Sequence, residues 1–239
     1  MGIMEYADFE NRDYNCARLW YYRGKESLSD IDKISCFEEA LKCNGNDIKS
    51  LMALENIYYS LEKYEDAKSI CFKLLKIKRN NSLAHNNLGR IYLKEKKYDD
   101  AIKSFKIAIK TDKENPFPHN GIGDYYKEKK EYNNAIIQYE RAIDKANRKG
   151  KEFSSPWNGW GDILRLQEKY NEAIKKFDKA IELNENFIWP WYFKALCYLE
   201  TNQYENAQIC YEKILEINPD FQHLEELEYK LENLKNNKD

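Results

Sequence analysis

The stretch WNGWGDILRLQEKYNEAIKKFDKAI at residues 157–181 decides the fold, because its parts return along the chain at a fixed distance. Within it, Tyr170 is followed three residues later by Ala173. The same Tyr-x-x-Ala string occurs five times, with tyrosines spaced 34, 34, 38 and 34 residues apart, at Tyr64, Tyr98, Tyr132, Tyr170 and Tyr204. A period of this length is typical of a chain built from repeated helical units.

Each Tyr-x-x-Ala string opens an amphipathic stretch. Apolar residues follow the alanine four, seven and eight positions later, as Phe177, Ala180 and Ile181 follow Ala173. These offsets fall on one face of a helix, so each stretch is expected to bury that face. A second amphipathic stretch precedes each tyrosine, and it carries a small residue that allows close helix packing. That small residue is Gly89, Gly123, Gly161 or Ala195. The sequence therefore predicts an all-α fold made of helix pairs.

These residues resemble the tetratricopeptide repeat family, whose pattern is Trp-x-x-Leu-Gly-x-x-Tyr, then Ala-x-x-x-Phe, then a closing Pro. The match is good at Trp157, Gly161, Tyr170, Ala173 and Phe177. In the first clear repeat, Glu55 stands where the family has a small residue and Cys71 where it has an aromatic one. The resemblance implies a right-handed α-solenoid of antiparallel helix pairs with a concave groove and about 13 helices.

The period also predicts how the chain is divided. We expect an N-terminal segment, a degenerate first repeat, five clear repeats with one four-residue insertion, and a C-terminal capping helix. The limits are 1–13 for the segment, 14–47 for the degenerate repeat, 48–81, 82–115, 116–149, 154–187 and 188–221 for the clear repeats, 150–153 for the insertion and 222–239 for the cap.

Composition excludes several classes of protein. The net charge is -2, which argues against nucleic-acid binding. The N-terminus has neither the basic start nor the apolar run of a signal peptide, and no apolar run is long enough to cross a membrane. Tyr6 stands where a myristoylation signal has Ser or Thr. We expect a soluble, intracellular protein, in the cytoplasm.

No pattern in the sequence predicts chemistry. The six cysteines form no Cys-x-x-Cys pair and only three histidines accompany them, so we expect no metal site. The cysteines are interpreted as buried, reduced thiols. Phosphate-binding and hydrolase motifs are also missing from the sequence, so we expect neither a cofactor nor an enzyme activity.

The resemblance implies that the first helix of each repeat lines the groove, and this indicates the candidate binding residues. A row of asparagines lies at equivalent positions, and a carboxamide can both donate to and accept from a peptide backbone. The alternative, equally weighted, is that these are ordinary solvated residues. The polar candidates are Asn56, Asn86, Asn87, Arg90, Asn120, Asp124, Asn158 and Asp162.

A second candidate feature is aromatic. Trp189, Tyr192 and Phe193 would face the groove in the last repeat, where exposed aromatics serve as interface anchors. The alternative is that the terminal helix folds over them. A chaperone-tail clamp is excluded, because Met52, Phe117 and Gly121 replace the basic residues that the family's clamp uses; Asn56 and Asn87 match its asparagines.

The sequence thus predicts a non-enzymatic module that binds a peptide or protein segment in its groove. The rival hypothesis is a self-associating structural scaffold, a homo-oligomer that pairs through the aromatic C-terminal end. A helical-repeat array that binds RNA is disfavoured by the charge.

Overall fold

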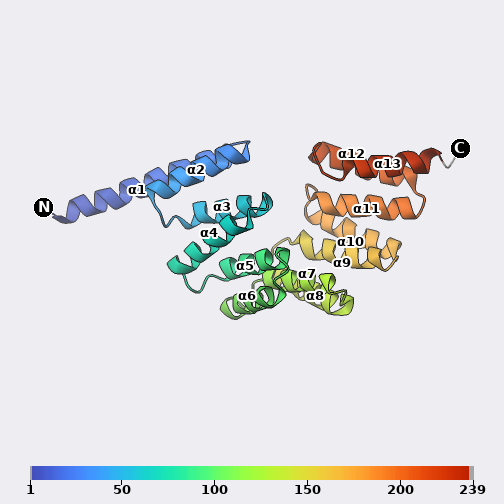
Figure 1. Cartoon of the computed structure of the whole chain (residues 1–239), viewed down its shortest axis with the longest axis horizontal. Helices are drawn as coiled ribbons and strands as arrows, with labels where there is room; N and C mark the ends of the chain where they lie inside the picture. The colour runs from blue at the N-terminus through green and yellow to red at the C-terminus, as the bar shows by residue number, and fades with distance from the viewer. Residues whose placement is uncertain (1, 237–239) are drawn as a thin grey trace. The chain divides into compact units, whose positions relative to one another are not determined.

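The computed structural model describes residues 2–236, and the side chains of residues 13–233 and Lys235. Within residues 2–236 it has thirteen α-helices and no strand, which confirms the predicted all-α solenoid class (Figure 1). The chain divides into two compact units, and the division falls between Lys113 and Glu114.

Unit 1 consists of three successive helix pairs, in which each helix packs against the one that follows it (Figure 1). Its helices are α1 (Gly2–Glu26), α2 (Asp30–Cys43), α3 (Ile48–Ser60), α4 (Tyr64–Ile77), α5 (Ser82–Lys94) and α6 (Tyr98–Thr111).

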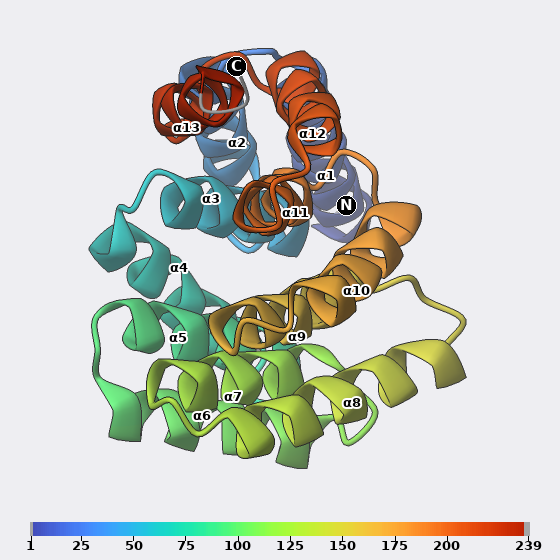
Figure 2. The same ribbon diagram turned by 90° about the vertical axis from the view of Figure 1, so that its right-hand side faces the viewer.

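Unit 2 continues the same arrangement with three further pairs and a last helix (Figure 2). Its helices are α7 (Phe117–Glu128), α8 (Tyr132–Arg148), α9 (Ser154–Leu166), α10 (Tyr170–Leu183), α11 (Ile188–Glu200), α12 (Tyr204–Ile217) and α13 (Leu224–Asn236). Within this unit α9 also contacts α7 and α11, so the first helices of successive pairs lie side by side.

The repeated tyrosine marks the first residue of each second helix from α4 to α12. The alanine three residues later is fully buried in all five cases, because its small side chain lets the first helix of the pair approach closely. The aromatic or cysteine four residues after the alanine is also fully buried in the first four of these helices, at Cys71, Phe105, Tyr139 and Phe177.

A common turn ends the first helix of each pair from α3 to α11. In α5, the Lys97 N–H donates to the Tyr92 carbonyl at 2.8 Å and the Lys96 N–H to the Leu93 carbonyl at 3.0 Å, while Lys96 has a φ of 60°. These two bonds around a left-handed residue form a Schellman motif, which satisfies carbonyls that a helix end leaves free. A left-handed residue recurs at the equivalent place in the other turns, at Glu62, Lys130, Glu168 and Asn202.

Tyr139 is the central core residue of unit 2, because it fills the space between two glycines. A Cβ on Gly123 of α7 or on Gly159 of α9 would lie 2.5 Å from a carbon of the Tyr139 ring. The ring is fully buried and cannot move aside. Both glycines are therefore required by the close approach of α7, α8 and α9.

We expect Gly159→Ala to lower the free energy of unfolding by about 2 kcal/mol, because the added methyl group overpacks the Tyr139 ring. Urea unfolding followed by circular dichroism measures the change. Gly45→Ala is the control, since its Cβ would meet only the Leu41 carbonyl at 3.7 Å, and it should leave stability within about 0.5 kcal/mol of the parent. Equal losses for both variants would contradict this packing.

The first helix pair differs from the others. α1 runs unbroken from Gly2 to Glu26, across the predicted limit between residues 13 and 14. An added Cβ on Gly24 would lie 2.8 Å from the Phe37 ring. The register of the later repeats places Tyr21 opposite Phe37, and their ring centres are 5.7 Å apart. In this pair a tyrosine and a glycine one turn later share the contact that a single small residue makes in the later repeats.

The prediction that all six cysteines are buried, reduced thiols is wrong for two of them. Cys16 of α1 and Cys43 of α2 form a disulfide with an S–S distance of 2.10 Å, and neither residue is fully buried. The antiparallel packing of α1 and α2 brings these positions together, although they are 27 residues apart in sequence. The remaining four cysteines, Cys36, Cys71, Cys197 and Cys210, are buried and free.

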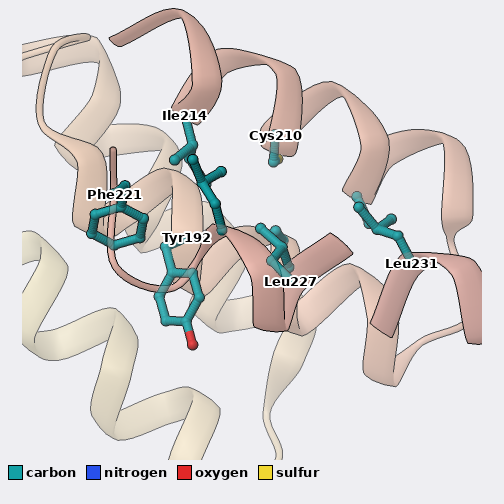
Figure 3. Packing of buried hydrophobic residues seen from close by; sticks show 9 residues of the cluster. Tyr192, Cys210, Ile214, Phe221, Leu227 and Leu231 are labelled. Atoms are coloured by element: carbon teal, nitrogen blue, oxygen red, sulfur yellow. The ribbon is translucent and has the colours of Figure 1, made fainter. Parts of the chain in front are cut away.

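The last helix, α13, packs on the preceding helix pair of unit 2. Leu224, Leu227 and Leu231 of α13 join one buried cluster with Tyr192 and Ile214 (Figure 3). This contact covers the apolar side of the last helix pair, which is the purpose of a terminal cap in a repeat protein. The Leu234 side chain and residues 237–239 of the predicted capping segment lie outside the described part of the chain.

Candidate functional site

In unit 1, three of the candidate residues surround the side chain of Glu55, which the sequence did not predict as part of a binding site. The Asn87 Nδ2 of α5 donates to the Glu55 carboxylate of α3, and the Asn86 Nδ2 donates to the Asn87 Oδ1 at 3.1 Å. The Arg90 guanidinium carbon lies 4.2 Å from the centre of the Tyr59 ring. Three of the predicted residues thus form one polar cluster, whereas Asn56 is exposed.

Glu55 is the electrostatic centre of this cluster. Its exposed fraction is 0%, and burial raises the pKa of its carboxyl to about 7. The positive charge of Arg90 and the hydrogen bond from Asn87 oppose that increase only in part. In the described part of the chain, the Glu55 Oε1 and the Asn86 Oδ1 have no hydrogen-bond partner. The cluster therefore holds two buried acceptors that are not satisfied.

In unit 2 the first such cluster surrounds Asp124 of α7. The Tyr139 hydroxyl donates to the Asp124 Oδ1 at 2.7 Å, and the Asn120 Nδ2 donates to its Oδ2 at 3.2 Å. Burial raises the pKa of the Tyr139 hydroxyl, and the Asp124 carboxylate raises it further. Tyr139 therefore stays a neutral donor that fixes the Asp124 carboxylate.

The second cluster of unit 2 is an ion-pair network around Asp162 of α9. The Lys127 Nζ of α7 lies 2.9 Å from the Asp162 Oδ2, and the Arg165 Nη2 lies 2.7 Å from its Oδ1. Asp162 is buried, with an exposed fraction of 6%. Burial alone would lower the pKa of Lys127, but the Asp162 and Asp124 carboxylates raise it overall. The network links α7 to α9.

The aromatic candidates lie beside this network, at the C-terminal end of the unit. The Arg165 guanidinium carbon is 5.2 Å from the centre of the Phe193 ring, and the Trp189 and Phe193 ring centres are 5.6 Å apart. The turn before α13 packs over two of the three aromatics: Phe221 contacts Trp189 edge-on at 5.4 Å, and His223 stacks on Tyr192 at 5.0 Å. Trp189 and Phe193 remain partly exposed, while Tyr192 is buried.

Profiles of the tetratricopeptide repeat match residues 82–115, 119–144 and 164–229, which together make up more than half of the chain. The chain is a tetratricopeptide repeat protein. No curated protein matches the sequence.

Solved structures share this repeat fold. The chain is similar to yeast Tom70 (19% identity, TM-score 0.72, over 93% of this chain and 47% of that one). It is similar to a chain of the APC/C hetero-tetramer Cut9–Hcn1 (18% identity, TM-score 0.72, over 94% of this chain and 44% of that one). A tetratricopeptide repeat protein from Parabacteroides merdae is also similar (16% identity, TM-score 0.72, over 92% of this chain and 82% of that one). The chain therefore spans less than half of the first two proteins, and identities this low show the fold alone.

Three asparagines at equivalent positions of this tetratricopeptide repeat protein share one feature. Asn86 in unit 1, and Asn120 and Asn158 in unit 2, each have a buried side-chain oxygen without a partner in the described part of the chain. A solvated surface asparagine would have its oxygen in water instead. A buried acceptor without a hydrogen bond lowers folding stability by about 1–3 kcal/mol, and this loss recurs in three repeats.

Sequence reasoning missed Glu55, Lys127 and Arg165. A signal for them exists, because Asn87 lies 32 residues after Glu55 and Asp162 lies 35 after Lys127, close to the 34-residue period of a tetratricopeptide repeat. Residues about one period apart on successive first helices lie side by side.

In the described residues no helix is long and apolar enough to span a membrane, and no group of three His, Cys, Asp or Glu side chains could hold a metal.

Proposed function

We propose that the protein is a non-enzymatic interaction module, and that the first helices of its repeats bind an extended segment of a partner protein. Tetratricopeptide repeat proteins generally mediate protein–protein interaction. In unit 2 the binding surface is the side of α7, α9 and α11 that carries Asn120, Asp124, Asn158, Asp162 and Phe193. In unit 1 it is the side of α3 and α5 that carries Asn56, Asn86, Asn87 and Arg90.

The observation that carries this proposal is the repeated unsatisfied asparagine oxygen. An extended peptide presents a backbone N–H at every other residue on each side, and such a donor would satisfy an asparagine oxygen after a small side-chain rotation. The repeat period sets the spacing of these acceptors along the chain. Each recovered hydrogen bond contributes about 0.5–1.5 kcal/mol, so several together give a useful affinity.

Trp189 and Phe193 would supply the apolar anchors of this surface, since both rings keep part of their area exposed. Tyr192 contributes less, because His223 covers it. The rival hypothesis of a scaffold that self-associates through this aromatic end would use the same exposed ring area of Trp189 and Phe193. Phe221 and His223 pack on Trp189 and reduce the area that either kind of partner could bury there.

A peptide selected by display against the whole protein tests the proposal. We expect the double variant Asn120→Ala/Asn158→Ala to bind this peptide about tenfold or more weakly, because two hydrogen bonds are lost. Fluorescence anisotropy measures the affinity. Asn147→Ala/Asn171→Ala is the matched control, since both of these asparagines are exposed on second helices. Unchanged affinity for the first variant, with Phe193→Ala also unchanged, would rule out this surface.

A further inference from the structure

Another candidate surface lies on α4 of unit 1, away from the residues of the proposed peptide site. A pocket of about 830 Å³ opens along α4 and the turn before α3. Its lining includes Asn46, Phe72, Lys73, Lys76 and Ile77. The side of α4 that packs into the core carries other residues, namely Ala67, Cys71 and Leu74. The volume falls within the range of ligand-binding clefts.

The charge at this pocket is net positive, because its lining has three lysines, Lys68, Lys73 and Lys76, against one carboxylate, Glu65. Between Ala67 and Arg79 the chain has five basic residues and no acidic one, although its overall net charge is -2. Lys68 is neutralised, because its Nζ lies 2.8 Å from Glu65 and 2.9 Å from Glu95. Lys73 and Lys76 form no salt bridge with any described residue. Their two ammonium groups therefore leave a local positive potential at the pocket.

Two apolar side chains line the pocket together with these cations. Phe72, which directly precedes Lys73, has an exposed fraction of 47%, and Ile77 lies about one turn after Lys73. An exposed aromatic ring that lies beside unpaired lysines can bury apolar area and bind carboxylates at the same place.

We propose that this α4 surface (Phe72, Lys73, Lys76 and Ile77) binds an acidic segment of a partner protein that contains an aromatic or large aliphatic residue. Glutamate or aspartate carboxylates pair with the Lys73 and Lys76 ammonium groups, and the apolar side chain packs on Phe72. The charge complementarity selects the acidic segment, and the exposed ring selects its apolar residue.

A protein segment fits this surface better than a nucleic acid or a membrane. Phosphate backbones need a track of many cations, whereas only Lys73 and Lys76 line the pocket without an acidic partner. Stable membrane attachment needs several inserted apolar side chains together with basic ones, and Phe72 is a single exposed ring. A protein ligand also agrees with the general role of the repeat family.

The test uses the whole chain and a fluorescein-labelled, glutamate-rich peptide with one central tyrosine. We expect binding in the micromolar range, weakened at least tenfold by Lys73→Glu/Lys76→Glu and several-fold by Phe72→Ala. Raising the salt concentration should weaken it too. The matched control is Lys103→Glu/Lys106→Glu on α6, which reverses two exposed lysines at the same spacing and should leave the affinity unchanged.

Three outcomes would overturn the proposal. One is equal binding of the peptide by the α4 variants and the α6 control. Another is equal binding of a peptide with glutamine in place of every glutamate. The third is retention of an RNA oligonucleotide or of phosphatidylserine vesicles with no binding of the acidic peptide. Since the substituted residues lie outside the proposed asparagine site, Asn120→Ala/Asn158→Ala should not affect this peptide, which keeps the two proposals separable.

Discussion

Replacement of Asp162 by alanine is expected to lower the free energy of unfolding by about 3 kcal/mol. The Asp162 carboxylate is buried between the Lys127 ammonium and the Arg165 guanidinium. Without it, two cations of α7 and α9 face each other with no shared counter-charge. The loss should fall at the lower end of the range for a broken buried pair, because Lys127 and Arg165 each keep about a quarter of their side chain exposed.

Urea unfolding at neutral pH measures this effect, and Asp144→Ala is its control. Asp144 also forms an ion pair in unit 2, with the Arg148 Nη2 at 2.6 Å, but both partners are more than half exposed. Solvent screens such a pair, so its loss should cost no more than about 0.5 kcal/mol. If the two aspartate variants were equally stable, the buried network would have no special role in joining α7 to α9.

The repeat register is the part of the fold that the sequence could predict. Offsets of four, seven and eight from Ala173 place Phe177, Ala180 and Ile181 on one face. Phe177 and Ala180 are fully buried, and Ile181 is partly buried. The same argument holds for the other second helices, because an α-helix turns every 3.6 residues whatever its neighbours are. The helices of the five clear repeats, α3 to α12, and their pairing therefore follow from the period.

Side-chain partners were harder to predict, because they depend on the distance between helices. The asparagine row was found from its spacing, but the Asn87 bond to Glu55 and the Asn120 bond to Asp124 were not. The sequence also left open whether the C-terminal segment covers the aromatic residues. Packing of Phe221 on Trp189 depends on the path of the turn between α12 and α13, which no periodicity determines.

The Cys16–Cys43 disulfide shows a different limit. Its two cysteines belong to the least regular pair, α1 and α2, which lacks the Tyr-x-x-Ala string of the later repeats. A pairing that spans 27 residues has no local motif, and four other cysteines compete for it in sequence. Only the antiparallel packing of α1 against α2 selects these two.

Glu55 and Cys71 departed from the repeat pattern together, and the packing explains why. In the later repeats a glycine faces an aromatic ring, as Gly89 faces Phe105. In the pair of α3 and α4, the large side chain is Glu55 on the first helix and the small one is Cys71 on the second helix. Both are fully buried. Exchange of the two sizes fills a similar volume, so each departure compensates for the other. The exchange introduces a buried carboxyl group in place of an apolar ring.

This carboxyl group leads to a pH-dependent expectation. The pKa of Glu55 is about 7 in the folded protein and about 4.5 when exposed. Between about pH 4.5 and pH 7, Glu55 keeps its proton in the folded state but releases it in the unfolded state. The free energy of unfolding therefore falls as the pH rises through this range. Glu55→Gln cannot lose that proton. At pH 8 it should therefore be more stable than the parent by roughly 3 kcal/mol, and near pH 4 about equal to it.

Unfolding midpoints in urea, measured at several pH values from about 4 to 8, test this expectation. Glu65→Gln is the control, because Glu65 lies on the exposed side of α4 with a side-chain exposed fraction of 82%. It should change stability by less than about 0.5 kcal/mol at every pH. The Glu55 variant should also keep the hydrogen bond with Asn87, since glutamine has a carbonyl oxygen at the same place. If Glu55→Gln were no more stable than the parent at pH 8, Arg90 and Asn87 would hold the Glu55 carboxylate charged. The centre of the unit 1 cluster would then be an ion pair and not a buried acid.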